Sequence, residues 1–286
     1  MFRTLEELAN EGELMYKWET ELVREQLYSI IKDAAYAARV GRQLVEVVNL
    51  KAGANIKVDK ETVDAITVAR AEPGSRLLID NEAYEQQTIT PVKYGGVVQI
   101  TGEIKEDANW DIMRRNIKRW GTKIGLKEDT IIFDSFSNAT YGFSTQSGHA
   151  YTSAGTEIDV PDIVGMIAHI RAHDYFPNVM VLNPAQIAEL NQIDTFVEAD
   201  KVGNRATFEK GFCGKIYGLD VVETTSVAAS TGYMLDTREA GMFVIRRPLT
   251  VKPFEIPERD SYGAAVTFRA AAQVIRPKAG CVLTVS

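Results

Sequence analysis

The sequence predicts an α+β fold, in which helices and antiparallel strands are grouped in separate parts of the chain. The stretch "VVQITGEIKEDANWDIMRRNIKRWGTKIGLKEDTIIFDSF" (97–136) joins a short strand pattern to one long amphipathic run. Residues 56–90 are polar, alternate in the manner of strands and contain a Pro-Gly turn, and strand and helix patterns alternate after residue 150. These three observations predict a long helix, a projecting hairpin and a separate α/β region.

A chain of 286 residues is long enough for about two domains. Its net charge of −7 argues against general nucleic-acid binding through phosphate neutralisation, although an acidic wall can still enclose DNA at a distance. Cys213 and Cys281 are the only cysteines, which predicts a reducing compartment and no disulfide framework. The sequence has neither a secretory signal nor an apolar window of about 18 residues, so we expect a soluble intracellular product.

The N-terminal region is expected to form a short arm (1–14) and then a helix from about Met15 to Val40. Apolar residues recur there at steps of three and four, namely Trp18, Leu22, Leu27, Ile30, Ile31, Ala34 and Ala35. Gly41 is a suitable helix stop. The following "QLVEVVNLK" predicts a strand, which "AGAN" closes.

The polar stretch from about residue 56 to 90 predicts an extended β-hairpin. It has two strand-like arms, a turn at Pro73-Gly74 and few large apolar side chains, so it cannot bury a core of its own. An isolated two-stranded hairpin is only marginally stable in water. We therefore expect the hairpin to project from the body and to rest on another subunit.

The central helix is expected from about residue 108 to 134, after a strand that ends near Thr101. Asp107 or Asn109 can cap it, and a helix of this length measures about 40 Å. Its apolar stripe consists of Met113, Ile117, Trp120, Ile124 and Ile131. Most of its remaining surface is basic, through Arg114, Arg115, Lys118, Arg119, Lys123 and Lys127.

The second half of the chain begins with a Ser/Gly-rich junction, "SNATYGFSTQSGHAYTSAG" (137–155). We expect a helix in "VPDIVGMIAHIRAHDY" with Pro161 near its first turn, a buried strand in "NVMVLNP", and a helix beginning at Asn183-Pro184. Further strands are predicted in "GKIYGLDVVETTSV", "GYMLDT" and "GMFVIRRPLTVKPF". The last segment, "AAVTFRAAAQVIRPKAGCVLTV", is expected to hold strands that return to the first domain.

The titratable residues offer no convincing catalytic site. His169 and His173 could present two nitrogens to a metal from one helix face, but no third ligand is indicated, so two surface or boundary histidines are the better interpretation. His149 has no companion nucleophile motif. In "GFCGKIYG" the glycines at 211, 214 and 218 lack the ending of a phosphate loop, which favours turn glycines and a structural role for Cys213.

Charged residues of the hairpin and of the central helix are expected to be solvated or to face neighbouring subunits. The hairpin acids could bind a divalent cation but follow no recognisable loop pattern; they are Asp59, Glu61, Asp64, Glu72, Asp80, Glu82 and Glu85. The basic stripe could contact phosphates, but acids before and after it favour a salt-bridged or intersubunit face. The sequence thus predicts no catalytic, cofactor-binding or metal-binding residue and no enzymatic activity.

Two sets of local sequence occur in an informative order. The first is "EQQTITPVKYGGVVQITGEIKEDANWDIMRRNIKRWGTKIGLKEDTIIFDSF" (85–136), and the second is "NVMVLNPAQIAEL", "GKIYGLDVVETTSV" and "GYMLDTREAGMFVIRRPLTV". In these stretches and in the order of its parts, the chain resembles major capsid proteins of tailed double-stranded DNA viruses, of the Hong Kong 97 phage type. The final "VTFRAAAQVIRPKAGCVLTV" is similar to the returning strands of their peripheral domain, so the resemblance extends from about residue 15 to the end.

This resemblance implies the Hong Kong 97 phage-type capsid fold, built from five parts. They are an N-terminal arm and helix (1–53), an extended β-hairpin loop (54–92), a peripheral domain with a long spine helix (93–149), an axial α/β domain (150–245) and the return strands of the peripheral domain (246–286). Lys57 and Lys60 lie in the region of the family's lysine-asparagine cross-link, but they match no motif, so no cross-link is predicted.

The resemblance also implies a function. Subunits would self-assemble as pentamers and hexamers into an icosahedral shell that encloses a double-stranded DNA genome without sequence-specific binding. The implied partners are the chain itself, a portal and decoration proteins, with no membrane and no cofactor. The scaffolding segment of some relatives is not expected at the N-terminus, which implies either a separate scaffolding protein or a chain already in its mature form. The implied location is the virion, with assembly in the host cytoplasm.

Two alternatives remain open from the sequence. "YKWETELVREQLYSIIKDAAYAARVGRQLVEVV" is similar in pattern to the N-terminal helix of encapsulins, which are cellular nanocompartment shells of the same fold that enclose cargo enzymes. A different class is an α/β enzyme or binding protein that uses residues 150–245. The strand and helix alternation there is its only support.

Overall fold

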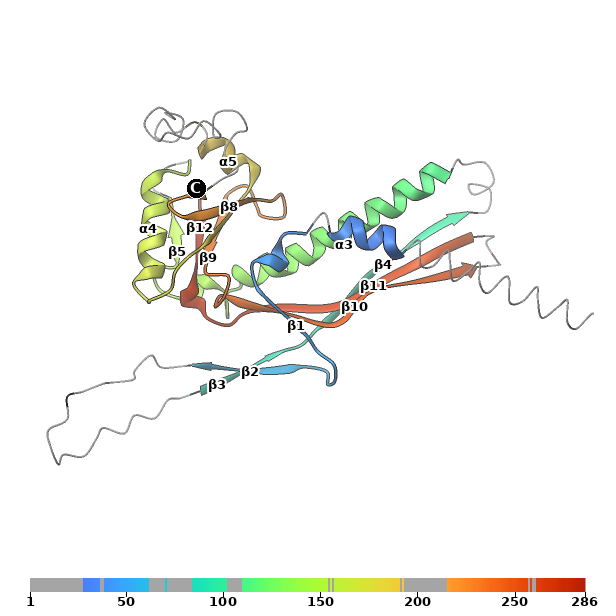
Figure 1. Cartoon of the computed structure of the whole chain (residues 1–286), viewed down its shortest axis with the longest axis horizontal. Helices are drawn as coiled ribbons and strands as arrows, with labels where there is room; N and C mark the ends of the chain where they lie inside the picture. Colours follow the sequence, from blue (N-terminus) through green and yellow to red (C-terminus); the bar gives the residue numbers. More distant parts are fainter. Residues whose placement is uncertain are drawn as a thin grey trace, which may run out of the picture.

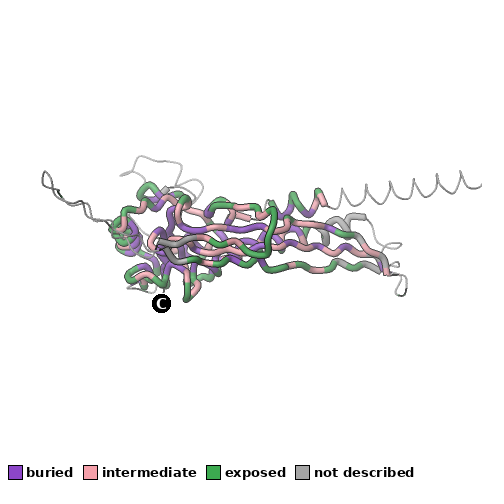
Figure 2. Tube along the Cα trace, turned by 90° about the horizontal axis from the view of Figure 1, so that it is seen from below, coloured by how far each residue is buried: buried purple, intermediate pink, exposed green. Residues whose placement is uncertain are grey.

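The computed structural model describes residues 28–36, 39–61, 70, 84–101, 110–153, 155, 157–190, 192, 215–256, 258 and 261–285. These residues form an elongated α+β body, in which a long helix runs beside one sheet and ends against a second (Figure 1). Buried segments continue through the length of this body (Figure 2). The predicted α+β class is confirmed.

The first sheet has four strands in the order β1-β10-β11-β4. Its strands are β1 (Glu46–Asn49), β4 (Val92–Thr101), β10 (Gly241–Ile256) and β11 (Ser261–Val274). β1 is parallel to β10, and the other neighbours are antiparallel. The register of β10 against β11 shifts on both sides of Arg247, next to Pro248, because proline cannot donate to the ladder and is tolerated at such bulges.

The long helix is α3 (Trp110–Phe136), whose 27 residues correspond to a length of about 40 Å. The central helix expected over 108–134 is therefore confirmed. Its buried side chains include Ile124 and Ile131, and Trp120 is partly buried against the same core. A Cβ at Gly96 of β4 would overlap the Trp120 ring, so the glycine makes room for the indole.

A shorter helix over 28–36 crosses α3 on another side. A Cβ on Gly121 would stand 2.6 Å from the carbonyl oxygen of Ile31 and 2.7 Å from Cβ of Ala34, so the two helices meet where α3 has no side chain. The buried residues Ile31, Ala34 and Ala35 confirm that part of the predicted N-terminal helix pattern. Trp18, Leu22 and Leu27 lie outside the described residues.

The second sheet has six strands in the order β5-β12-β9-β6-β8-β7. Its strands are β5 (Ala150–Thr152), β6 (Val179–Leu182), β7 (Lys215–Ile216), β8 (Leu219–Glu223), β9 (Thr231–Leu235) and β12 (Gly280–Thr284). Alternate residues of β9 enter different cores, since side chains alternate across a strand. Tyr233 packs with Phe133 and Phe136 of α3, whereas Met234 lies in the core on the helix-covered face.

Two helices cover that second face, α4 (Val160–Arg171) and α5 (Pro184–Leu190). Asp159 is the N-cap of α4, and its N–H donates to the carboxylate of Asp162, which completes a capping box. The predicted proline lies beside it in the first turn. α5 begins at the predicted Asn-Pro step, where the Asn183 side chain accepts a hydrogen bond from the N–H of Ala185. Both helix starts were correctly predicted from these residues.

A separate two-stranded ribbon consists of β2 (Ile56–Glu61) and β3 (Tyr84–Ile89). They pair antiparallel from Ile56 opposite Ile89 to Glu61 opposite Tyr84. Figure 1 shows this pair diverging from the four-stranded sheet. The predicted hairpin arms are thus confirmed, and the predicted Pro73-Gly74 turn lies outside the described residues.

Two segments differ from the sequence prediction in where they pair. The last strands of the chain were expected to return to the first domain. This is correct for β11, which lies beside β4, and wrong for β12, which lies between β5 and β9 in the six-stranded sheet. Between them, the 3-10 turn η4 (Pro277–Ala279) redirects the chain. The five domain boundaries stay predictions.

Candidate functional site: a latch on the long helix and an anchored hairpin

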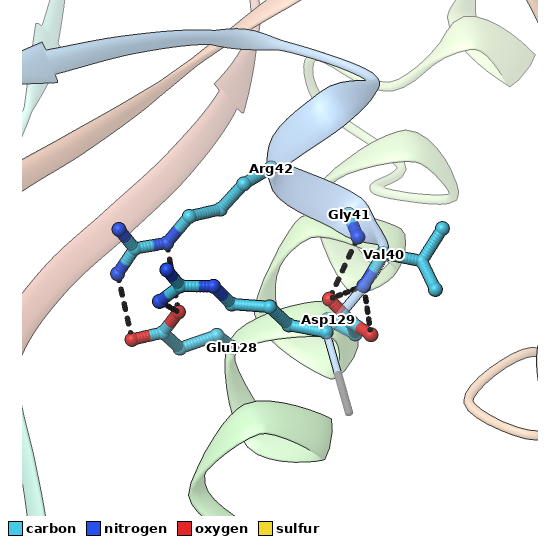
Figure 3. A network of polar contacts seen from close by, with 6 residues as sticks. Val40, Gly41, Arg42, Glu128 and Asp129 are labelled. Carbon is cyan, nitrogen blue, oxygen red and sulfur yellow. Dashed lines mark hydrogen bonds and ion pairs between the residues drawn. The ribbon is translucent and has the colours of Figure 1, made fainter. Parts of the chain in front are cut away.

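Four charged side chains connect the segment after the N-terminal helix to the middle of α3 (Figure 3). Arg42 donates from Nε and Nη2 to the two carboxylate oxygens of Glu128, at 2.8 Å each, and Arg39 Nη1 donates to Glu128 Oε2 at 3.4 Å. The Glu128 side chain is only 3% exposed, so both arginines hold a charge that is shielded from water. We call Arg39, Arg42, Glu128 and Asp129 the latch.

Asp129 holds the backbone of the same segment. Its carboxylate accepts from the N–H of Val40 at 2.9 and 3.1 Å and from the N–H of Gly41 at 2.8 Å, at the start of the 3-10 turn η1 (Gly41–Gln43). Burial raises the pKa of Asp129, and the two backbone donors oppose that rise. A Cβ at Gly41 would stand 2.8 Å from Cδ1 of Ile132, so this close approach requires glycine.

Sequence reasoning did not identify the latch. Glu128 lies four residues after Ile124, at a position where the apolar stripe of α3 continues. A carboxylate on a buried stripe requires a partner, because an unpaired buried charge is strongly destabilising. The position of Glu128 on the stripe therefore indicates, from the sequence alone, that this carboxylate has a partner. The sequence does not identify the partner, because the contact is with a residue more than 80 positions away. The glycine expected as a helix stop serves instead as a donor to Asp129.

The base of the β2–β3 hairpin is tied to the four-stranded sheet by side chains. Gln273 Nε2 donates to Gln87 Oε1 at 3.1 Å, and Arg269 Nη2 donates to the carbonyl oxygen of Pro91 at 3.1 Å. Both donors lie on β11. Beyond this base, β2 and β3 hydrogen-bond as a ladder only with each other within the described residues. The hairpin is therefore anchored at one end and leaves the body at the other.

The basic side chains of α3 lie largely on its exposed face. Those at 115, 118, 119, 123 and 127 are exposed. Lys127 Nζ stands 5.8 Å from the ring centroid of Tyr94 on β4, a weak cation–π contact. The side chain of Arg114 lies outside the described part. The expectation that this face meets subunits rather than phosphates stays a prediction.

His169 and His173 are confirmed as a surface and a boundary histidine. His169 lies in the last turn of α4 and is exposed, and His173 lies beyond the end of that helix and is partly exposed. His149 lies in the loop before β5, as expected, but it is fully buried, with its ring centroid 5.4 Å from that of His173 and 6.4 Å from that of His169. Among the described residues, no group of three potential ligands could hold a metal ion.

The glycine-rich stretch before β8 is partly described. Tyr217 and Gly218 have φ values of 49° and 87° between β7 and β8, which is the backbone of a two-residue hairpin turn, so Gly218 is confirmed as a turn glycine. Residues 211–214, with Cys213, lie outside the described residues. The other thiol, Cys281, is fully buried, and burial raises its pKa to about 12.

The hairpin acids are only partly placed. Asp59 and Glu61 lie on β2 and Glu85 lies on β3, where it pairs with Lys60 across the ladder. The acids at positions 64, 72, 80 and 82 lie outside the described residues. No helix in the described part of the chain is long and apolar enough to span a membrane. Within the described residues, the two features that the structure shows are the latch on α3 and the anchored hairpin.

A family model described as phage capsid protein matches residues 84–283. This range begins at β3 and includes α3, the helices α4 and α5, the six-stranded sheet up to residue 283, and the four-stranded sheet apart from β1. A search of curated proteins gave no match.

Solved structures with a similar fold include two from phages and one virus-like particle. The mature capsid of bacteriophage PhiM1 is 13% identical with a TM-score of 0.65, over 86% of either chain. A structure from Microbacterium phage Oxtober96 is 16% identical with a TM-score of 0.66, over 86% of this chain and 91% of that one. The virus-like particle from Pyrococcus furiosus is 14% identical with a TM-score of 0.62, over 91% and 99%. At such identities the likeness shows the fold.

Proposed function

The chain belongs to the phage capsid protein family and has the Hong Kong 97 phage-type capsid fold, and on this premise we propose that it is the major capsid protein of a tailed double-stranded DNA virus. Subunits self-assemble as pentamers and hexamers into an icosahedral shell around the genome. The observation that carries the proposal is the family match over 84–283, because that range contains α3 and every strand of the two sheets except β1 and the last residue of β12.

The role is structural and not enzymatic. Membership of a capsid family indicates this role, and the polar contacts of the latch support it. They join the segment around Val40 to α3, so they hold elements in position. An α/β enzyme built on residues 150–245 has no site to support it in the described residues.

The hairpin over 54–92 is proposed to be the extended loop that reaches a neighbouring subunit. The support is its geometry. β2 and β3 form a two-stranded ribbon that is fastened by Gln87 and the Pro91 carbonyl at its base. A ribbon of this kind is marginally stable alone, so a surface of another copy is the natural place for it to gain contacts. Residues 93–149 and the part of 246–286 that forms β10 and β11 then belong to the peripheral domain. Residues 150–245 belong to the axial domain, which β12 joins through its pairing with β5 and β9.

The shell encloses double-stranded DNA without reading its sequence, in keeping with a net charge of −7. Further partners in this proposal are a separate scaffolding protein, a portal and decoration proteins. The mature location is the virion, after assembly in the host cytoplasm. No cofactor is part of the proposal.

A second candidate is an encapsulin-type nanocompartment shell that encloses cargo enzymes. It is favoured by the likeness to the Pyrococcus furiosus virus-like particle, which extends over 91% of this chain and 99% of that one. Neighbouring genes separate the two candidates. Terminase, portal or protease genes indicate a virus, whereas a peroxidase or ferritin-like gene indicates a nanocompartment.

Cryo-electron microscopy of particles purified after expression of the full chain tests the proposal. We expect closed shells with five-fold and six-fold clusters of subunits, in which the β2–β3 hairpin of each copy lies on a neighbour. Shells in which the hairpin stays on its own subunit would overturn the proposed role of that segment. The absence of any closed particle would overturn the proposed function.

A further inference from the structure

All three histidines of the chain meet at one place in the six-stranded-sheet region. His149 precedes β5, His169 lies in the last turn of α4, and His173 follows that helix. The contact is close, because a Cβ on Gly148, whose φ is 79°, would stand 2.9 Å from Nδ1 of His169. The histidine cluster, as we call these three residues, thus lies between the 146–152 segment and α4.

The hydrogen bonding of His149 identifies its neutral form. Its Nδ1 lies 2.6 Å from the carbonyl oxygen of Gly280, at the start of β12. A carbonyl oxygen only accepts, so Nδ1 carries the hydrogen and Nε2 of the neutral ring carries the lone pair. Nε2 is buried with no hydrogen-bond partner within the described residues. A proton added at Nε2 would therefore create both a buried charge and a buried N–H without an acceptor.

The groups around His149 do not compensate such a charge. His169 faces it from α4 and His173 from the turn after α4, and on β12 the Cys281 thiol donates to the His149 carbonyl oxygen at 3.0 Å. From β5, the Tyr151 ring lies 6.1 Å from that of His169. Burial is the largest cause of the lowered pKa of His149, and His173 and His169 lower the pKa further, whereas the hydrogen bond to Gly280 opposes this without reversing it. No carboxylate contributes among the described groups.

We propose that the histidine cluster is an acid-responsive contact, which loosens the packing of the 146–152 segment and β12 against α4 when the pH falls. His149 lies beside the exposed His169 and the partly exposed His173, so the histidine cluster borders on solvent. A proton on His149 is accommodated only when its ring reaches water. The loosening then reaches Gly280, because its carbonyl loses the hydrogen bond from Nδ1.

The direction with pH follows from linkage. The pKa of His149 in the folded protein lies below its ordinary value of 6.5, so the unfolded or opened state binds the proton first. The stability that the neutral ring provides is fully present above 6.5. It is lost progressively as the pH falls from there towards the folded-state pKa, with a tenfold change in the opening equilibrium for about each pH unit within that window.

Histidine C2 hydrogen exchange read by mass spectrometry tests the proposal directly on the assembled protein. We expect His149 to titrate below 6.5, and backbone exchange of 146–152 and 160–171 to rise on acidification after correction for the intrinsic rate. His149→Asn keeps an N–H donor for Gly280 and cannot titrate, so this rise should be much reduced. His169→Asn is the matched control, in which the rise is largely kept.

Two results would overturn the proposal. One is a His149 that titrates at or above 6.5, and the other is backbone exchange that rises equally in wild type and His149→Asn. If His149→Asn does not fold, the titration of His149 and the backbone exchange of the wild type still decide.

Discussion

Arg42 donates two parallel N–H···O hydrogen bonds of 2.8 Å each to Glu128, although the two residues are 86 positions apart in sequence. This bidentate geometry is the strong form of the arginine–carboxylate contact, and it occurs here with a carboxylate that is 3% exposed. Its effect is to fix the segment that follows the helix over 28–36 against the second half of α3.

Glu128→Gln is expected to lower the free energy of unfolding by about 2–3 kcal/mol, because it leaves two arginines near a site without its charge. Equilibrium urea unfolding of unassembled subunits measures this. The double variant Arg42→Met, Glu128→Met is the control, and should recover much of the loss, since a packed apolar pair is often as stable as a buried ion pair. A change below about 0.5 kcal/mol for Glu128→Gln would mean that the pair is solvated.

Asp129→Asn tests the pH behaviour of the latch. The pKa of Asp129 is raised by burial above 3.8, so the folded state holds the proton more tightly than the unfolded chain. Stability from this group is fully present below 3.8 and is lost as the pH rises through the folded-state pKa. The stability of wild type relative to Asp129→Asn should therefore increase as the pH is lowered from neutral to about 4.

The control for this comparison is Asp129→Ala, which leaves the N–H groups of Val40 and Gly41 without an acceptor. Asp129→Ala should lower the free energy of unfolding by about 1–3 kcal/mol at neutral pH, which is more than Asp129→Asn lowers it. A wild-type advantage over Asp129→Asn that shrinks on acidification would contradict the direction of the pKa shift.

Trp120→Ala is expected to destabilise the subunit by about 2–4 kcal/mol, near the lower end for a tryptophan because the ring is only partly buried. Gly96→Ala should also destabilise, since its methyl group would overlap the same ring. The two changes should be non-additive. In the Trp120→Ala background, Gly96→Ala should cost much less than alone, as measured by a double-mutant cycle on thermal unfolding.

Cys281 should not react with a maleimide in the folded protein. Its thiol is fully buried, and its pKa of about 12 leaves almost no thiolate at neutral pH. The measurement is mass-spectrometric labelling of a Cys213→Ser variant, with and without denaturant. Rapid modification without denaturant would show that β12 opens readily from its place beside β5 and β9.

A shortened hairpin separates folding from assembly. Residues 62–83 are replaced by Asn-Gly, which joins Glu61 to Tyr84, the last pair of the described ladder, through a two-residue turn. The subunit should fold with unchanged circular dichroism and thermal unfolding, because its cores lie elsewhere. It should fail to close shells. Closed shells from this variant would remove the hairpin from the assembly contacts, and loss of folding would place it in the core.

Local patterns explain which elements could be predicted. The apolar stripe that includes Ile124 and Ile131 predicts α3, and the proline at 161 marks the start of α4, because helix periodicity and capping are local in sequence. The alternating polar arms likewise predict β2 and β3. Fold family followed from the order of these parts rather than from any single motif.

Long-range pairing explains what could not be predicted. β12 is a short, continuously buried apolar run, and such a run does not indicate whether its partner strand is β11 or β9. His149 gave no signal in a Ser/Gly-rich stretch, since its burial depends on α4 and on Gly280 at the other end of the chain. Glu128 could be recognised in the sequence only as a charge on an apolar stripe. Its partners, Arg39 and Arg42, lie in the segment after the N-terminal helix and could not be identified from that pattern.

The mass of the purified full-length protein tests the central claim most directly. Multi-angle light scattering after size-exclusion chromatography, with negative-stain microscopy of the same fractions, reports whether subunits close into shells. We expect uniform closed particles of megadalton mass, built from many copies of the 31.7 kDa chain. A monomer or dimer under every condition of salt, pH and concentration would contradict it.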